Sequence, residues 1–307
     1  MSSDTLRFSV EREEAGQRLD RVVIRRVPGL GRKRAARLFA SGAVQIEGRP
    51  ALKGEPATAG AELTVELAPP ESVAAEPDAP LDVRLEMPGL VVVAKPAGQP
   101  SVALDDAERG TLAGALLGRY PEMRSVGYRP REPGLLHRLD TQTSGLLVAA
   151  RSASVFEHLR AELRAGRLAK RYLAVVAGEG LDDRGTVDAP IAPDRTNRKR
   201  VRVGPDIQHQ RGARRARTRY RVLEKRAHFA LVEVEVSHAY RHQVRAHLAF
   251  IGHPIAGDIL YGGEPVEAIG PRHALHASYV AWAGDTELPA FAVEDALPDD
   301  LRRVLGD

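Results

Sequence analysis

The chain has 307 residues, enough for two domains, and its net charge of +4 comes with cations that are mostly arginine, which favours a polyanionic partner. It contains no cysteine, which excludes disulfides, a thiolate nucleophile and zinc bound through sulfur. No run approaches the roughly 18 apolar residues of a membrane span, and the polar start over 1–4 is unlike a signal peptide, so we expect a cytoplasmic protein without membrane contacts.

Residues 1–67 predict a small domain of two helices and a few strands. Apolar residues recur at helical spacing over 16–26 and 32–39, with arginines on the other side of the first helix. Alternating patterns over 44–49 and 62–67 are typical of paired strands. Together with a concentrated positive charge, these elements suit a small RNA-binding unit.

The second predicted helix carries a dense cluster of cations. Like charges this close repel unless a polyanion neutralises them, so we favour phosphate contacts over a solvated helix face. The order of elements resembles the S4 RNA-binding domain, in which two helices precede a strand that ends in Asn-Gly. Here Glu47 takes the asparagine position and Gly48 is kept. The residues expected to contact RNA are Arg32, Lys33, Arg34 and Arg37.

A linker is predicted over 68–80. The segment is rich in proline, acidic and free of aromatic residues, so it should be semi-extended and unable to build a core. We expect a tether that lets the domain over 1–67 reposition relative to the larger domain over 81–307.

A cluster of polar and charged side chains precedes a short apolar run within 133–150. The run over 146–150 predicts a strand buried on both faces. Charged residues at the mouth of such a strand are unfavourable unless they are paired, so His137, Arg138 and Asp140 indicate a site. The alternative is a polar loop in which Asp140 caps a turn.

The string His-Arg-Leu-Asp-x-x-Thr-Ser-Gly-Leu-Leu over 137–147 closely resembles the active-site motif of the RluA family of pseudouridine synthases. The resemblance implies that Asp140 is the catalytic aspartate. It also implies an α+β fold for 81–307 around a mixed, largely antiparallel sheet, with the site in a basic cleft. With the module that resembles the S4 domain, the resemblance covers nearly the whole chain.

A predicted strand over 170–178 begins with a second motif of the family, Lys-x-Tyr-x-Ala-x-Val-x-Gly. The resemblance implies that Tyr172 lies under the target base, and a phenol face suits a uracil ring, because stacking of a base on an aromatic ring is worth roughly 1–3 kcal/mol. Without the motif, Tyr172 would be read as an interior tyrosine with a satisfied hydroxyl.

The stretch over 195–221 holds eleven Lys or Arg residues and one acid. Glycine, proline and weak periodicity predict that it is mostly loop and becomes ordered when RNA binds. Arg219 and Arg221 should share one face of a following strand and extend the loop into a basic stripe, which favours nucleic acid over a membrane. The residues chosen as RNA contacts are Arg198, Lys199, Arg200, Arg214 and Arg215.

A helix is predicted over 240–252, with Arg241 and Arg245 stacked one turn apart. This segment resembles the family's Gly-Arg-Thr-His-Gln-Ile-Arg motif, except that 239–241 reads Ala-Tyr-Arg. The arginine that pairs with the catalytic aspartate in the family falls at Arg245. The histidines of this region favour structural roles over a metal site, because no carboxylate accompanies them at zinc-binding spacing.

These residues predict an RNA pseudouridine synthase that needs no cofactor and no metal, since the reaction involves no redox step. Arg245 should hold Asp140 ionised, and Arg138 should enter the RNA stack in place of the flipped uridine. The residues leave open whether Asp140 attacks C1′, attacks the base or abstracts a ribose proton. A glycosidase would want a second carboxylate, and a non-catalytic RNA-binding protein would have no use for Asp140.

The RNA substrate and the oligomeric state are the two properties that the sequence constrains least. Relatives that carry an S4 domain often act on large-subunit ribosomal RNA, so we expect that substrate, with transfer RNA as the alternative. We expect a monomer. The sequence does not name the uridine that is modified.

Overall fold

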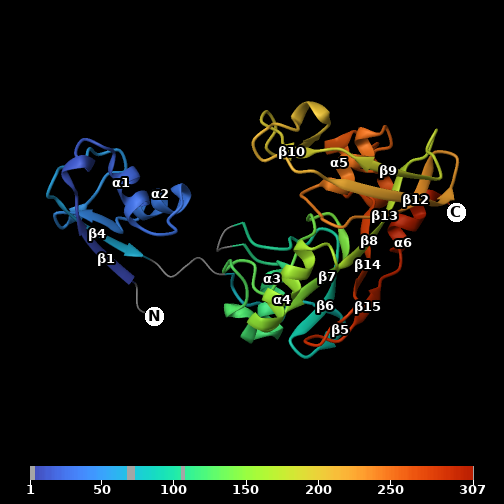
Figure 1. Ribbon diagram of the computed structural model, residues 1–307, viewed down its shortest axis with the longest axis horizontal. Helices are drawn as coiled ribbons and strands as arrows, with labels where there is room; N and C mark the ends of the chain where they lie inside the picture. The colour runs from blue at the N-terminus through green and yellow to red at the C-terminus, as the bar shows by residue number, and fades with distance from the viewer. Residues whose placement is uncertain (1–3, 68–72, 105–107, 307) are drawn as a thin grey trace. The chain divides into compact units, whose positions relative to one another are not determined.

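A computed structural model describes residues 4–67, 73–104 and 108–306, except for the side chain of Lys33. The chain divides into two compact units, 1–71 and 72–307 (Figure 1). Within the described ranges, no helix has both the length and the apolar character needed to cross a membrane.

The N-terminal unit is an antiparallel sheet in the order β1-β4-β2-β3 with two short helices. Leu19, Val22 and Val23 of the first helix are fully buried and pack in one core with Leu63 and Val65, which confirms the helical stripe. The first strand was not predicted. The elements are β1 (Asp4–Ser9), α1 (Leu19–Arg26), α2 (Arg32–Ala40), β2 (Val44–Ile46), β3 (Arg49–Pro50) and β4 (Glu62–Leu67).

Glu47 and Gly48 form the tight turn between β2 and β3. Both residues have positive φ, 49° and 76°, while Ile46 pairs with Arg49 across the hairpin. This left-handed conformation is unfavourable for a residue such as glutamate, whereas asparagine tolerates it. The difference from the Asn-Gly turn of the S4 domain is therefore a local source of backbone strain.

We expect Glu47→Asn to raise the free energy of unfolding of the N-terminal unit by about 1 kcal/mol, because asparagine relieves this strain. Urea unfolding of the full chain, followed by circular dichroism, measures the change. Glu47→Gln is the matched control, since it removes the same charge and keeps the strain. Equal stability of the two variants would contradict the explanation.

The larger unit is built on a nine-stranded sheet in the order β5-β6-β7-β14-β8-β13-β12-β9, with β15 also paired to β14 (Figure 1). Among the described strands of this sheet, β7 and β14 run parallel and all other neighbours are antiparallel. The predicted α+β fold with a mixed, largely antiparallel sheet is confirmed.

The bounds of these elements are β5 (Asp82–Met87), β6 (Leu90–Lys95), α3 (Leu112–Arg119), β7 (Ser144–Ala150), α4 (Ala153–Arg164), β8 (Ala169–Ala177), β9 (Arg184–Asp188), β10 (Ile191–Pro193), β11 (Val201–Val203), β12 (Arg217–Lys225), β13 (Phe229–Glu235), α5 (Gln243–Phe250), β14 (Leu275–Trp282), β15 (Phe291–Glu294) and α6 (Asp299–Leu305). Strands β10 and β11 form a separate hairpin.

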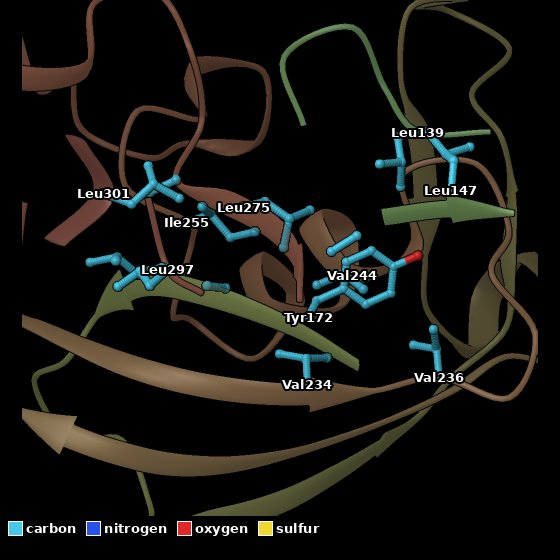
Figure 2. Packing of buried hydrophobic residues seen from close by; sticks show 14 of the residues in the cluster. Leu139, Leu147, Tyr172, Val234, Val236, Val244, Ile255, Leu275, Leu297 and Leu301 are labelled. Atoms are coloured by element: carbon cyan, nitrogen blue, oxygen red, sulfur yellow. The ribbon is translucent and has the colours of Figure 1, made fainter. Parts of the chain in front are cut away.

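Strand β7 is buried on both faces, as its apolar run predicts. Leu147 and Ala149 join the core on one face of the sheet, while Leu146 and Val148 join the core on the other. Figure 2 shows the first of these cores, to which strands β7, β8, β13 and β14 and helices α5 and α6 contribute. A doubly buried central strand gives the loop that precedes it a rigid anchor.

The linker prediction is wrong over 73–80, and 68–72 lie outside the described residues. Val73 is 1% exposed in the core of the larger unit, and the backbone N–H of Glu76 donates to Gly114 at 2.9 Å. A side chain at Gly118 would meet the backbone of Glu76 at 2.3 Å, so only glycine allows this approach. The composition of 73–80 could not reveal a groove formed by glycines of a distant helix.

The stretch over 195–221 runs from the turn of the β10–β11 hairpin into β12. Outside β11, one short 3-10 turn at Pro205–Ile207 and the start of β12, it consists of turns and irregular backbone, so the prediction of a stretch that is mostly loop is confirmed. Helix α5 starts at Gln243 rather than at 240, because His242 has φ of 55° and stands outside the helix. Arg241 therefore does not stack on Arg245 along a helix.

Candidate active site

The loop between 137 and 143 carries Asp140 to the mouth of β7. Ser101 Oγ donates to the carbonyl of Leu139 at 2.7 Å and accepts from its N–H at 3.1 Å. On the other side of Asp140, Lys95 Nζ donates to the carbonyl of Thr141 at 3.1 Å. Both neighbours of the aspartate are thus fixed by buried side chains, which limits the positions that its carboxylate can take.

Arg245 of α5 joins two carboxylates. Its Nη1 donates to Asp140 Oδ2 at 2.7 Å, while its Nε and Nη2 donate to Asp258 at 2.7 and 2.8 Å. The Asp258 side chain is 1% exposed and that of Arg245 is 8% exposed. The predicted pairing of Asp140 with Arg245 is present. Asp258 was missed as a site residue, although Gly257 and Asp258 match a Gly-Asp pair in the family's sequence after this helix.

Asp140 is held in its ionised form. Burial works to raise its pKa, but His242, Arg245 and His273 outweigh burial, the two imidazoles only at the acid pH at which they are protonated, and the pKa lies below its usual value of 3.8. Burial lowers the pKa of His242 to about 4, so this imidazole is neutral at pH 7. Arg245 is then the lasting counter-charge, and its carboxylate partners raise its own pKa above the usual range.

A chain of hydrogen bonds behind the imidazole of His242 holds it facing the second carboxylate oxygen of Asp140. The N–H of Val201 on β11 donates to the hydroxyl of Tyr261 at 2.9 Å, and that hydroxyl lies 2.9 Å from Nδ1 of His242. The Tyr261 hydroxyl can therefore donate to Nδ1, which places the imidazole proton on Nε2. Nε2 lies 3.6 Å from Asp140 Oδ1.

A cleft of about 810 Å³ opens in front of the carboxylate. Among the described residues that line it, Lys and Arg outnumber Asp and Glu by six to three, so the cleft is basic. Arg138 is on the rim, with its side chain 52% exposed and its Nη1 donating to Glu132 at 3.0 Å. The basic residues that line the cleft are Arg138, Arg160, Arg164, Lys170, Arg241 and Arg245.

Tyr172 is 5% exposed and packs in the core beside the site. Figure 2 shows its ring between Val236 and Val244, with its hydroxyl end on the side of Leu139 and Leu147. Burial raises the pKa of Tyr172, and the charge of Asp140 raises it further. Tyr172 is not among the described residues that line the cleft. The phenol stays protonated at neutral pH.

The cations of the β10–β11 turn and of the segment before β12 are exposed, as expected of RNA contacts. Arg200 is partly engaged, because its Nε donates to the buried carboxylate of Asp194 at 2.7 Å. Arg241 holds the turn by donating to the carbonyls of Arg198 and Lys199 at 3.1 and 2.7 Å. The exposed predicted residues are Arg198, Lys199, Arg200, Arg214 and Arg215.

On α2 of the N-terminal unit, Arg32 and Arg37 are exposed and Arg34 is half-buried. The side chain of Lys33 lies outside the described part of the chain. The structure therefore leaves two guanidinium-bearing side chains of this helix at the surface of the unit.

The arginines of β12 do not extend the basic surface, so the predicted stripe is wrong. Arg219 lies 3.5 Å from Glu235 and Arg221 lies 3.0 Å from Glu233, both acids on the neighbouring β13. Arg217 pairs with Asp188 on β9. Pairing across the sheet neutralises this face, and it could not be predicted without the strand register.

Comparisons with known proteins identify related sequences and a matching family model. The family model described as RNA pseudouridylate synthase matches residues 89–250. A protein of Chloroflexus aurantiacus named as an RNA pseudouridine synthase is 37% identical over 95% of this chain and 90% of its own length. The ribosomal large subunit pseudouridine synthase D of Xanthomonas campestris pv. campestris is 34% identical over 95% of this chain and 89% of its own.

Among solved structures, human RNA pseudouridylate synthase domain containing 4 shares the fold. Its TM-score is 0.56 at 23% sequence identity, and the match covers 73% of this chain and 92% of that chain. Human RNA pseudouridylate synthase domain containing 1 gives a TM-score of 0.55 at 24% identity, over 72% of this chain and 86% of that chain.

Proposed function

This chain belongs to the RNA pseudouridine synthase family, and from that premise we propose that it isomerises specific uridines of large-subunit ribosomal RNA. Its activity is that of an isomerase acting on uridine in RNA. The choice of ribosomal RNA is supported by relatives from Xanthomonas campestris pv. campestris and Nitrosomonas europaea, both named ribosomal large subunit pseudouridine synthase D.

Asp140 is the proposed catalyst. The reaction breaks the bond between N1 and C1′, turns the base and joins C5 to C1′, and an ionised carboxylate can serve as nucleophile and then as base. The observation that carries this assignment is the 2.7 Å contact from Arg245 to Asp140. It keeps the carboxylate charged and leaves its other oxygen directed toward the cleft side of the site, where His242 lies.

Arg138 is proposed to fill the place that the flipped base leaves, and Tyr172 is proposed to stack on that base. A guanidinium plane at the cleft rim can stack in the place that the flipped uridine leaves, which recovers part of the few kcal/mol that flipping costs. Tyr172 packs in the same core as Leu139, the sequence neighbour of Asp140, and its ring would supply a face for the uracil. This role requires the ring to become more accessible when RNA binds.

The N-terminal unit is proposed to be an RNA-binding module of the S4 type. Its support is the pair of short helices packed on a small antiparallel sheet, together with the cations of α2. Contacts from this helix would be to phosphates, so they would add affinity without selecting a base. The second set of proposed contacts is on the β10–β11 turn and, at Arg214 and Arg215, on the segment before β12.

We expect Tyr261→Phe to lower the rate of isomerisation severalfold and to leave RNA affinity unchanged. The variant loses the hydroxyl that fixes the tautomer of His242 and that accepts from Val201, while the aromatic ring is kept. Single-turnover rates and equilibrium binding measured on the same RNA separate the two effects. A rate equal to that of the wild type would show that the tautomer of His242, whose Nε2 faces Asp140, does not matter for the reaction.

The substrate class can be tested in cells. Large-subunit ribosomal RNA and transfer RNA are isolated from the source organism with and without a disruption of the gene, and pseudouridine is mapped after chemical derivatisation. Loss of a pseudouridine from ribosomal RNA, restored by the wild-type gene, is the expected result. Loss from transfer RNA alone would leave the chemistry intact and overturn the choice of substrate.

A further inference from the structure

Lys170 is a buried cation that has no acid partner within residues 4–67, 73–104 and 108–306. It is the second residue of β8, 4% exposed, and it lines the active-site cleft. Burial lowers its pKa to about 8, and no hydrogen bond or ion pair offsets this effect among the described residues. The ammonium is therefore still mostly protonated at neutral pH, although the fold provides it with no counter-charge.

Arg160 of α4 adds a second cation to the same wall. Its Nη1 donates to the carbonyl of Leu136 at 2.9 Å, while its buried Nε has no hydrogen-bond partner in the described part of the chain. Burial, Lys170 and Arg160 together lower the pKa of His137 to about 3, so a neutral imidazole lies near both cations. Neutral His137 offers no negative charge, and Lys170 and Arg160 remain uncompensated in a site that an anion can enter.

We propose that Lys170 and Arg160 bind a phosphate of the RNA backbone beside the uridine on which Asp140 acts. The proposal rests on the proposed function, in which the target base meets Tyr172. Lys170 and Tyr172 are alternate residues on one face of β8, so their side chains leave the strand about 7 Å apart. That separation suits a base and the backbone phosphate attached to its nucleotide. A compact ammonium and a guanidinium both recognise phosphate as charge-assisted donors.

The test uses the full chain and a fluorescently labelled oligouridylate of twelve nucleotides, with binding followed by anisotropy over a series of salt concentrations. Lys170→Met should weaken binding roughly tenfold at low salt, since it removes one charge-assisted hydrogen bond. It should also lower the slope of log affinity against log salt by about 0.7, the loss of one phosphate contact. Lys170→Arg should restore most of both quantities.

The matched control is Lys225→Met, which removes a lysine that pairs with Asp183 away from the cleft lining. Its affinity and salt slope should equal those of the wild type. Because Lys170→Met removes an uncompensated buried charge, its melting temperature should equal or exceed that of the wild type. A lysine that merely supports the fold would give the opposite shift. If Lys170→Met does not fold, Arg160→Met measured in the same way decides the question.

Unchanged affinity and salt slope for Lys170→Met would overturn the phosphate site. Loss of isomerisation with unchanged binding would overturn it as well, because Lys170 would then act on the reacting base. Oligouridylate binding does not depend on which RNA is the natural substrate. Failure of this inference is therefore distinguishable from failure of the ribosomal RNA assignment.

Discussion

Arg245→Met should destabilise the larger unit by roughly 3–5 kcal/mol and abolish isomerisation. The substitution leaves the carboxylate of Asp258 buried at 1% exposure without its two hydrogen bonds from the guanidinium. It also frees Asp140 from its 2.7 Å contact. Urea unfolding measures the stability, and tritium release from uridine C5 measures the activity.

The control for this prediction is the double variant Arg245→Met with Asp258→Asn. It removes the unpaired buried charge, so most of the lost stability should return while activity stays absent. A double variant as unstable as the single one would contradict the explanation based on Asp258. An active Arg245→Met enzyme would show that Asp140 does not need this counter-charge.

Asp140→Asn should reduce the single-turnover rate by at least about 10³-fold and leave the fold and RNA affinity intact. Asparagine has nearly the same shape, and its amide oxygen can still accept from Arg245, but it has no charge. Binding to ribosomal RNA by filter retention, next to the rate, separates the two properties. Asp183→Asn is the control, since it removes an exposed acid that pairs with Lys225.

The lowered pKa of Asp140 also predicts the response to acid. The carboxylate stays ionised above its folded pKa, which lies below 3.8, so the wild-type rate should stay level from about pH 8 to about pH 5 as far as Asp140 controls it. A carboxylate whose pKa is lower in the folded state stabilises the fold at pH values above its pKa in the unfolded chain. This stability is lost as the pH falls through the pKa in the folded state. The stability difference between wild type and Asp140→Asn should therefore shrink below about pH 4.

A sharp fall in RNA affinity for Asp140→Asn would mean that the aspartate holds the site together and does not act on the base. A rate for the wild type that declines with an apparent pKa near 6 would show that another group must titrate. The first outcome tests whether Asp140 acts on the base, and the second tests whether Asp140 is the group whose ionisation controls the rate.

The sequence predicted the pairing of Asp140 with Arg245, because each lies in a long motif that resembles one family. Local pattern also predicted β7, whose continuous apolar run requires burial on both faces. The sequence did not reveal that Asp258 fixes Arg245 from the other side. That contact joins α5 to the segment before Ile259, and their proximity depends on how α5 packs against the sheet.

Errors arose where long-range pairing overrides local composition. The segment over 73–80 reads as a linker, yet two glycines of α3 open a groove that its backbone fits. The arginines of β12 read as a basic stripe, yet β13 places Glu233 and Glu235 opposite them. Helix α5 begins late because His242 adopts a left-handed conformation, which also directs its ring to Asp140. None of these contacts has a signature in a single stretch of sequence.

Release of tritium from uridine C5 tests the central claim most directly, because joining C5 to the sugar must expel that hydrogen. Large-subunit ribosomal RNA transcribed with labelled uridine is incubated with the purified chain and with Asp140→Asn. The account predicts release by the wild type, in proportion to enzyme and time, and none by the variant. Equal release by both, or none by a wild-type protein that binds the RNA tightly, would contradict it.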